Sequence, residues 1–210
     1  MKSIYILLTK SDTYISKIIQ LTTADAYTHA SVSFEKGLQP LYSFSRKHVN
    51  IPLPAGLRHE PLHIGFFQKY NDIPCALYEL RVSDAVYNAD KRKVEQMMQD
   101  ASFYRFSVLG LLLCRLNIPF HRRRYFFCSE FVSEVLHRSN ALCLPKDTSL
   151  MRPNDYTDIP ELFCRFRGKL NTLPQGQCLV SNVPFEGSQR SGMRRYILAA
   201  VSYLSFGLCK

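Results

Sequence analysis

Residues 122–136 have the sequence RRRYFFCSEFVSEVL, and this stretch predicts a helix that begins at a cysteine. Its apolar residues fall on one face of a helix with a period of 3.6 residues, which we expect to be buried: Phe127, Phe131, Val132, Val135 and Leu136. Ser129 and Glu130 are residue types preferred in a first helical turn. The pattern therefore predicts a helix with Cys128 near its N-terminus and its end near residues 139–140.

A helix start changes the chemistry expected of a cysteine. Unpaired backbone N–H groups and the positive end of the helix dipole stabilise a thiolate and so lower the thiol pKa. The same N–H groups can stabilise an oxyanion. A buried cysteine that only packs as a small hydrophobe is the alternative for Cys128. A neighbouring base is needed to distinguish the two.

Composition indicates one domain of ordinary size. The chain has 210 residues, of which 46% are hydrophobic, enough for a sizeable core, so we expect residues 1–210 to form a single domain. Its seven cysteines include no CxxC pair, and an odd number does not complete a disulfide framework. We therefore expect reduced thiols, a cytoplasmic protein, and no metal or other cofactor.

The formal net charge of +10 is compatible with nucleic acid, an anionic membrane surface or an acidic substrate as partner. Arginines cluster at 122–124 and at 190–195, but neither cluster has a nucleic-acid-binding signature around it. We favour an anionic substrate or a solvated face over nucleic acid. Residues 196–209 are uncharged but shorter than the ~20 residues of a membrane span. A core-packing terminal helix is expected there, with peripheral membrane contact through 194–209 as the alternative.

Periodicity predicts the other elements. Strands are expected over 4–9, 27–34, 41–46, 63–67 and 76–82, and helices over 11–21, 84–101 and 106–116, the last packed on the sheet. The strands over 27–34 and 41–46 should pair antiparallel. The segment with Pro52, Pro54, Gly56 and Pro61 is predicted to be a loop, as is 144–160. After residue 167 only a strand over 177–180 and a helix from 193 are indicated.

The second predicted strand carries a histidine at its start. Alternation places His29, Ser31 and Ser33 on one face, and apolar residues on the other. His29 therefore begins the strand on its less apolar side and is placed to face a cleft.

Three segments resemble a known family, and they are 27–32 (YTHASV), 41–44 (LYSF) and 127–132 (FCSEFV). They are similar to segments of the circularly permuted NlpC/P60 superfamily. Within that superfamily, they are most similar to the YaeF/YiiX group of papain-like amidases. In that family the histidine strand precedes the cysteine helix, as here. The resemblance is clearest over residues 4–136, and 168–210 would be a C-terminal extension. It implies an α+β, permuted papain-like fold, in which an antiparallel strand meander carrying the histidine packs against the cysteine helix.

The resemblance also assigns roles to catalytic residues. Cys128 would be the nucleophile, and His29 would take the thiol proton and later protonate the leaving group. In the family, a third residue orients the imidazole, and this residue is often an acid on the strand that follows the histidine strand. Ser43 stands at that position in this chain. A serine can orient a histidine but does not stabilise imidazolium as a carboxylate does. The alternatives are Ser45, a residue from elsewhere such as Glu60 or His63 of the following loop, or a weakened site.

Three further residues are candidates for substrate binding or for the oxyanion site. Tyr27 shares the alternation face of His29 and is placed to position it or to donate to an oxyanion, with a buried structural role as the alternative. Ser129 lies beside Cys128 at the helix start. Arg124 and its neighbours are candidates to contact a substrate carboxylate or phosphate.

These observations predict a cysteine amidase or peptidase that cleaves a small amide bond, as in cell-wall-type peptides, through a thioester and without a cofactor. The small amide- or peptide-containing substrate would be anionic if the arginines contact it. Two alternatives remain: a lipid or acyl amidase, or thiol acyltransferase, at a membrane surface, and a catalytically weakened ligand-binding module. The sequence does not indicate an oligomeric state.

Overall fold

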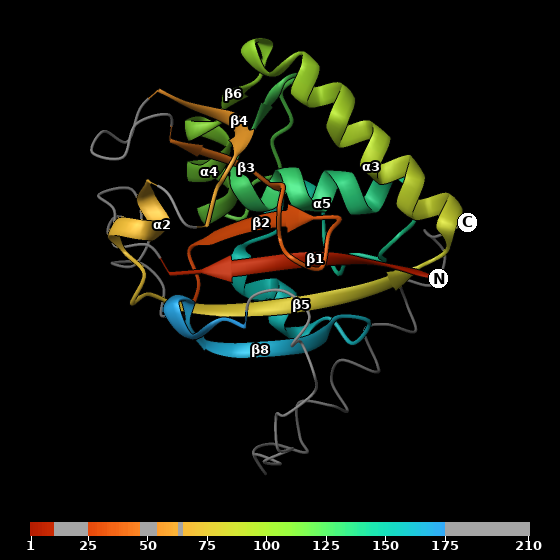
Figure 1. Ribbon diagram of the computed structural model, residues 1–210. Coiled ribbons are helices and arrows are strands. Elements are labelled where there is room, and N and C mark those ends of the chain that lie inside the picture. Colours follow the sequence, from red (N-terminus) through yellow and green to blue (C-terminus); the bar gives the residue numbers. More distant parts are fainter. Residues whose placement is uncertain (11–24, 47–53, 63–64, 175–210) are drawn as a thin grey trace, which may run out of the picture.

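The computed structural model describes residues 1–10, 25–46, 54–62 and 65–174, which form an α+β structure built on an antiparallel sheet (Figure 1). Its six strands are arranged in the order β4-β3-β2-β1-β5-β8. Their bounds are β1 Lys2–Thr9, β2 His29–Ser33, β3 Leu41–Arg46, β4 Ala55–His59, β5 Pro74–Val82 and β8 Phe163–Lys169. All neighbouring pairs in this sheet are antiparallel.

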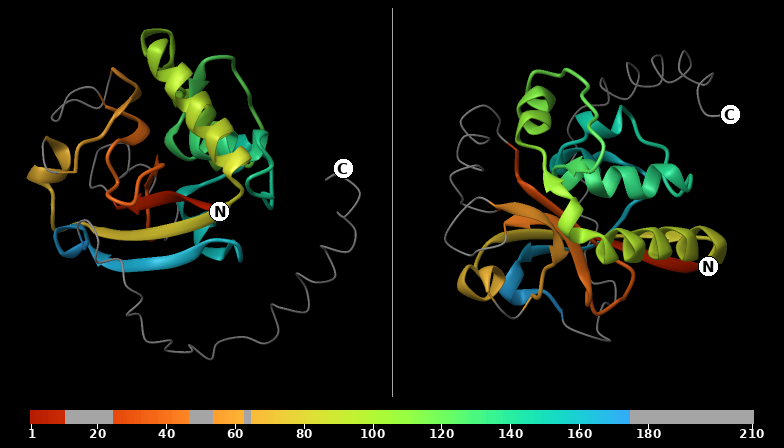
Figure 2. Two further views of the ribbon diagram at one scale, coloured as in Figure 1. Left: turned by 45° about the vertical axis from the view of Figure 1, so that its right-hand side comes forward. Right: turned by 90° about the horizontal axis from the view of Figure 1, so that it is seen from above.

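The described helices are α2 Phe66–Lys69, α3 Asp84–Gln99, α4 Val108–Arg115 and α5 Cys128–Arg138. Two short strands, β6 Arg105–Phe106 and β7 Tyr125–Phe126, form a separate parallel pair between these helices. Four 3₁₀ turns complete the elements: Ala101–Phe103, Thr148–Leu150, Pro153–Asp158 and Leu170–Thr172. Figure 2 shows α3, α4 and α5 on the same side of the sheet.

Side-chain alternation along β1 divides the core into two parts. Ile4, Ile6 and Leu8 belong to the larger cluster, which α3 and α5 cover, while Tyr5 and Leu7 belong to a second cluster on the opposite face. The larger cluster contains the buried apolar face of α5: Phe131, Val132, Val135 and Leu136. The predicted burial of this helix face is confirmed, and burial of several large apolar side chains holds α5 against the sheet.

Most predicted elements near the site are confirmed. The strands expected over 4–9, 27–34, 41–46 and 76–82 correspond to β1, β2, β3 and β5, and β2 pairs antiparallel with β3. The helix expected over 84–101 is α3, whose first turn is capped by the Ser83 side chain accepting the Val86 N–H at 3.3 Å. The cysteine helix ends at Arg138, one residue before the expected end.

Three predictions are wrong. The segment from 54 to 61 is not all loop, because it contains β4; its prolines flank the strand, which lies at the sheet edge and pairs only with β3. Phe66 and Phe67 begin helix α2 instead of ending a strand. The apolar helix expected over 106–116 is the shorter α4, and one of its faces is exposed instead of packed on the sheet: Val108, Leu109, Leu112 and Leu116.

The beginning of the predicted C-terminal extension pairs and packs with the sheet. β8 continues through Lys169, and Leu170 and Leu173 are buried in the second cluster. The elements expected over 11–21, over 177–180 and from 193, and the membrane contact expected through 194–209, fall outside the described residues. Within the part that the structure describes, no helix is both long enough and apolar enough to cross a membrane.

Candidate active site

Helix α5 places Cys128 at the start of a rigid element. Cys128 is the first residue of the helix and is 7% exposed. The preceding N–H, that of Phe127, donates to Glu130 Oε2 at 3.3 Å, so a buried carboxyl group caps the helix start. Because the apolar face of α5 is buried in the core, the position of the thiol is held by the packing of the whole helix.

Strand β2 places His29 beside this thiol. His29 is the first residue of β2, opposite Thr9 of β1, and its side chain is 14% exposed. The imidazole lies beside the Cys128 side chain, close enough for the two groups to shift each other's pKa. The juxtaposition of a cysteine at a helix start and a histidine at a strand start, expected from the sequence, is confirmed.

The carboxylate of Glu60 orients the imidazole. His29 Nε2 lies 2.9 Å from Glu60 Oε2, and Ser31 Oγ donates to the same carboxylate oxygen at 2.7 Å. Glu60 directly follows β4, and its side chain is only 11% exposed. Since Nε2 is engaged by Glu60, Nδ1 is the ring nitrogen left for the Cys128 thiol.

Ser43, for which we expected the contact with the imidazole, does not make it. It lies on β3, opposite Arg58 of β4, and is fully buried. Its hydroxyl faces the carboxylate of Glu60 and helps to lower the pKa of that group, but forms no geometrically acceptable hydrogen bond with any described residue. The position next to the imidazole is therefore occupied by the glutamate from the following strand.

Electrostatics favour the charged forms of all three side chains. Burial opposes charge on the imidazole, but Glu60 and Cys128 outweigh it and raise the pKa of His29 to about 10. Burial likewise opposes charge on Glu60, yet His29, Ser31 and Ser43 lower its pKa to about 2. For Cys128, burial raises the thiol pKa, while the hydrogen bond and charge of His29 act in the opposite direction and leave it below its ordinary value. The arrangement thus favours a thiolate–imidazolium pair.

Two backbone N–H groups add to the stabilisation of the sulfur. Ala30 and Ser129 both hydrogen-bond to the Cys128 side chain through their backbone and lower its pKa. The N–H of Ser129 comes from the first helical turn, where backbone donors have no partner within the helix. The predicted role of Ser129 in substrate binding or in the oxyanion site stays a prediction.

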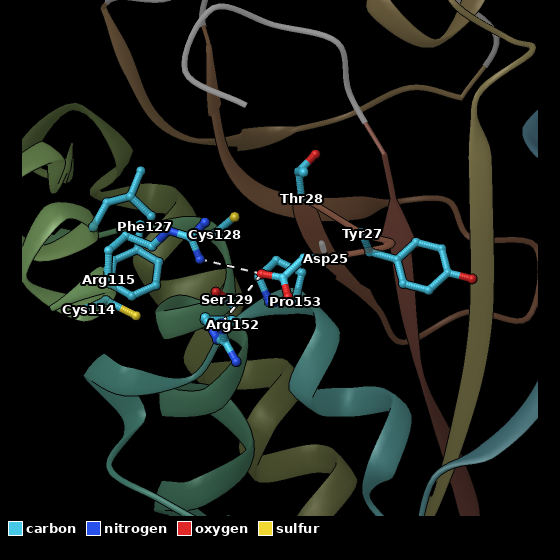
Figure 3. A pocket seen from close by; sticks show the side chains of 11 residues that line it. Asp25, Tyr27, Thr28, Cys114, Arg115, Phe127, Cys128, Ser129, Arg152 and Pro153 are labelled. Carbon is cyan, nitrogen blue, oxygen red and sulfur yellow. Dashed lines mark hydrogen bonds and ion pairs between the residues drawn. The ribbon is translucent and has the colours of Figure 1, made fainter. Parts of the chain in front are cut away.

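Tyr27 does not lie as the oxyanion role requires. Its ring points away from Cys128 in Figure 3 and belongs to the larger hydrophobic cluster. Burial raises the pKa of its hydroxyl. The next largest influences on this pKa come from Arg167, which lowers it, and from Tyr78, which raises it. Tyr27 lines the pocket at Cys128, but its ring packs in the larger cluster, so its position favours the structural alternative, and its part in substrate binding stays a prediction.

The arginine run does not contribute to the pocket wall at the thiol. Arg124 is exposed, and its guanidinium lies 5.1 Å from the ring centroid of Phe103, while that of Arg122 lies 3.8 Å from the ring centroid of Tyr125. Neither residue lines the pocket at Cys128. The run is a surface feature that stacks on neighbouring aromatic rings.

Cys128 also forms part of the wall of a small pocket (Figure 3). It encloses about 330 Å³, including space open to solvent. Polar and sulfur-containing residues along its wall are Asp25, Tyr27, Thr28, Cys114, Arg115, Cys128, Ser129 and Arg152. Cys128 is therefore both a partner of the imidazole and part of the pocket wall, as a nucleophile has to be.

The sequence indicates Glu60 only as a residue of a predicted loop, because Pro54, Gly56 and Pro61 conceal the short strand that precedes it. It does not indicate Asp25, Arg115 or Arg152. The run at 122–124 is adjacent to Cys128 in sequence, but its residues are absent from the pocket wall. No local pattern marks Arg115 or Arg152, which come from different parts of the chain.

Comparison with protein-family models, with curated proteins and with solved structures found no match for this chain. Among the residues that the structure describes, no group of His, Cys, Asp and Glu side chains is arranged to hold a metal ion. The five cysteines of this part of the chain form no disulfide.

Proposed function

We propose that this protein is a cysteine amidase or peptidase that acts through a thioester, with Cys128 as nucleophile, His29 as acid and base, and Glu60 as the group that orients and charges the imidazole. The contact of a helix-start thiol with a histidine held by a buried carboxylate carries the proposal. This order of strand and helix also supports a permuted papain-like arrangement, with the histidine strand preceding the cysteine helix.

In the proposed reaction, the Cys128 thiolate attacks the amide carbonyl carbon, and a C–S bond forms as the carbonyl electrons move to oxygen. Collapse of this intermediate breaks the C–N bond, and the imidazolium of His29 donates its proton to the leaving amine. The neutral imidazole then takes a proton from water, which attacks the thioester and releases the acid and the thiolate. Glu60 holds the ring and stabilises each imidazolium without itself becoming protonated.

The ligand-binding alternative was motivated by a serine at the position of the third acid. Glu60 supplies a carboxylate at hydrogen-bond distance from His29 Nε2, so that motivation no longer applies. A weakened site would also be expected to leave a buried thiol with a raised pKa, whereas the pKa of Cys128 is lowered.

An acyl probe tests the proposal without knowledge of the substrate. We expect p-nitrophenyl acetate to release p-nitrophenolate in a burst and to acetylate Cys128, detected by mass spectrometry of its peptide after an acid quench. Cys128→Ala should abolish the burst, and His29→Ala should slow it strongly. Acetylation that is confined to other cysteines, or that proceeds equally in His29→Ala, would contradict the proposal.

A lipid or acyl amidase, or an acyltransferase, at a membrane surface is the second candidate. It is favoured by the exposed stripe of α4, since Val108, Leu109, Leu112 and Leu116 fall within one side of that helix, while Leu111 and Cys114 line the pocket. Flotation of the full chain with vesicles of anionic phospholipid tests it. Binding that is lost in Leu109→Ser/Leu112→Ser, but retained in Phe163→Ser on β8, would support this candidate.

A further inference from the structure

The pocket beside Cys128 contains a group of charged side chains that the proposed chemistry does not use. Arg115 is the last residue of α4. Arg152 directly precedes the 3₁₀ turn Pro153–Asp158, and Asp25 lies in the segment before β2. Figure 3 shows both guanidinium groups directed to the carboxylate of Asp25. Three separate parts of the chain thus bring two cations and one anion to the pocket wall.

The two arginines share one carboxylate oxygen, so these three side chains carry an excess of positive charge at the pocket wall. Arg115 Nη1 lies 3.4 Å and Arg152 Nη1 3.6 Å from the same oxygen, Asp25 Oδ2. Both distances exceed the 2.7–2.9 Å typical of a charge-assisted hydrogen bond. Arg115 and Asp25 are largely buried, with side chains 14% and 13% exposed, whereas Arg152 is 34% exposed and so lies nearer to solvent.

Arg152 is also held from its other side. Its Nη2 lies 3.5 Å from Asp155 Oδ1, and the second oxygen of Asp155 contacts Lys146 at 2.7 Å. The guanidinium therefore lies between two carboxylates at the pocket wall. The planar fork of donors of an arginine matches the two oxygens of a carboxylate.

A second, independent observation concerns Ser129. Its hydroxyl is fully buried, lines the same pocket, and has no hydrogen-bond partner in the described parts of the chain. Buried hydroxyl groups are nearly always hydrogen-bonded, so an unpaired one in a pocket wall indicates a position where a ligand atom is bound. Ser129 directly follows the nucleophile, which places this position beside the reacting sulfur.

We propose that Arg115, Arg152 and Ser129 form an anion subsite that binds a carboxylate on the acyl part of the substrate, close to the bond that Cys128 attacks. The guanidinium groups bind the carboxylate oxygens, and the Ser129 hydroxyl donates to one oxygen at the subsite. This inference rests on the proposed function and specifies its substrate class as small amides whose acyl group carries a carboxylate. Asp25 keeps the two arginines in place and competes with the substrate for them.

A pair of alkylating probes tests this subsite. Iodoacetate and iodoacetamide transfer the same carbon to a thiolate, with a C–S bond formed and iodide released, and differ in that iodoacetate is anionic. The ratio of their rates at one residue cancels the nucleophilicity of the thiolate and reports the local preference for a carboxylate. The exposed Cys143 of the same protein molecule serves as the internal reference, read by peptide mass spectrometry.

We expect the iodoacetate-to-iodoacetamide ratio at Cys128 to exceed that at Cys143 in the full-length wild type. Arg152→Gln and Arg115→Gln should each lower the ratio by about fivefold or more, because each removes a charged donor to the carboxylate. Arg152→Lys, which keeps the positive charge, should lower the ratio at Cys128 less than Arg152→Gln does. Asp25→Asn should raise the ratio, since it removes the competing anion, and Arg124→Gln, outside the pocket, should leave it unchanged.

The structural alternative is that the two arginines only tie α4 and the turn at 152 to Asp25. It predicts that the variants lose thermal stability while the ratio at Cys128 stays at its wild-type value, and that result would overturn the subsite. A wild-type ratio no higher than that at Cys143 would also overturn it. Both results leave the proposed function intact as long as iodoacetamide alkylates Cys128 in a His29-dependent manner. If iodoacetamide does not react faster at Cys128 than at Cys143, the proposed function and the subsite fall together.

Discussion

Cys114 and Cys128 are both buried cysteines that line the same pocket, one near the end of α4 and the other at the start of α5. Burial raises the pKa of Cys114 to about 11, although Lys146 and Arg152 act in the opposite direction. Burial also acts to raise the pKa of Cys128, but its value is lowered. The two thiols therefore differ in their partners and not in their exposure.

The partners of Cys128 are contributed by β2 and by its own helix start. His29 lies beside the thiol and supplies positive charge, and the backbone N–H groups of Ala30 and Ser129 point to the sulfur. Cys114 lies at the opposite end of a helix, where the dipole does not stabilise an anion. The comparison teaches that the pKa of a buried thiol is lowered when fixed donors replace the water that it has lost.

The largest expected effect comes from removing each thiol in turn. Cys128→Ala should eliminate the acetyl-enzyme and reduce turnover by ~10³-fold or more, because the nucleophile is lost. Cys114→Ala is the matched control and should retain the burst of p-nitrophenolate, since that thiol has no base. A burst that survives in Cys128→Ala and disappears in Cys114→Ala would reverse the assignment.

Removal of the base should give the next largest effect. In His29→Ala the alkylation of Cys128 by iodoacetamide near pH 6 should fall by ~10²–10⁴-fold, because the thiol loses the cation that lowers its pKa. Cys114 should stay unreactive in both proteins. Equal rates at Cys128 with and without His29 would remove the difference between the two thiols.

Glu60→Gln tests how the carboxylate sustains that difference. It removes the charge that holds the pKa of His29 near 10, so the thiolate–imidazolium pair should be lost at a lower pH than in the wild type. We expect turnover of p-nitrophenyl acetate to fall by about 10–100-fold at neutral pH and its alkaline limb to move to lower pH. Ser43→Ala is the control, with an effect of about threefold or less, since Ser43 does not hydrogen-bond to the imidazole. A larger effect for Ser43→Ala than for Glu60→Gln would restore Ser43 as the orienting residue.

The smallest expected effect is on stability. The folded-state pKa of His29 is raised from 6.5, so its contribution is complete below pH 6.5 and is lost as pH rises towards 10. The pKa of Glu60 is lowered from 4.5, so its contribution is complete above pH 4.5 and is lost as pH falls towards 2. The difference in Tm between wild type and Glu60→Gln should therefore be greatest between pH 4.5 and 6.5. For a chain of this size, each kcal/mol lost from the free energy of unfolding lowers Tm by about 2–4 °C. Thermal unfolding between about pH 3 and pH 9 measures it, and a difference that does not vary with pH would contradict the coupled pair.

The sequence by itself determined the local features. The spacing of Phe131, Val132, Val135 and Leu136 predicted a helix with Cys128 near its start, and local residue patterns predicted the strands that correspond to β1, β2, β3 and β5. These predictions succeeded because helix and strand periods are set by backbone geometry within a few residues. The pairing of His29 with Cys128 came from the family resemblance, and the structure places the two side chains in contact.

Only the tertiary structure decided which distant residues complete the site. Glu60 reaches His29 because β4 pairs with β3 at the edge of the sheet, and Asp25, Arg115 and Arg152 meet because three segments end at one pocket. The apolar pattern of α4 likewise identified a helix but not that its outer face would be exposed. Periodicity specifies the faces of one element, whereas the neighbours of each face depend on how all the elements bury their apolar surface together.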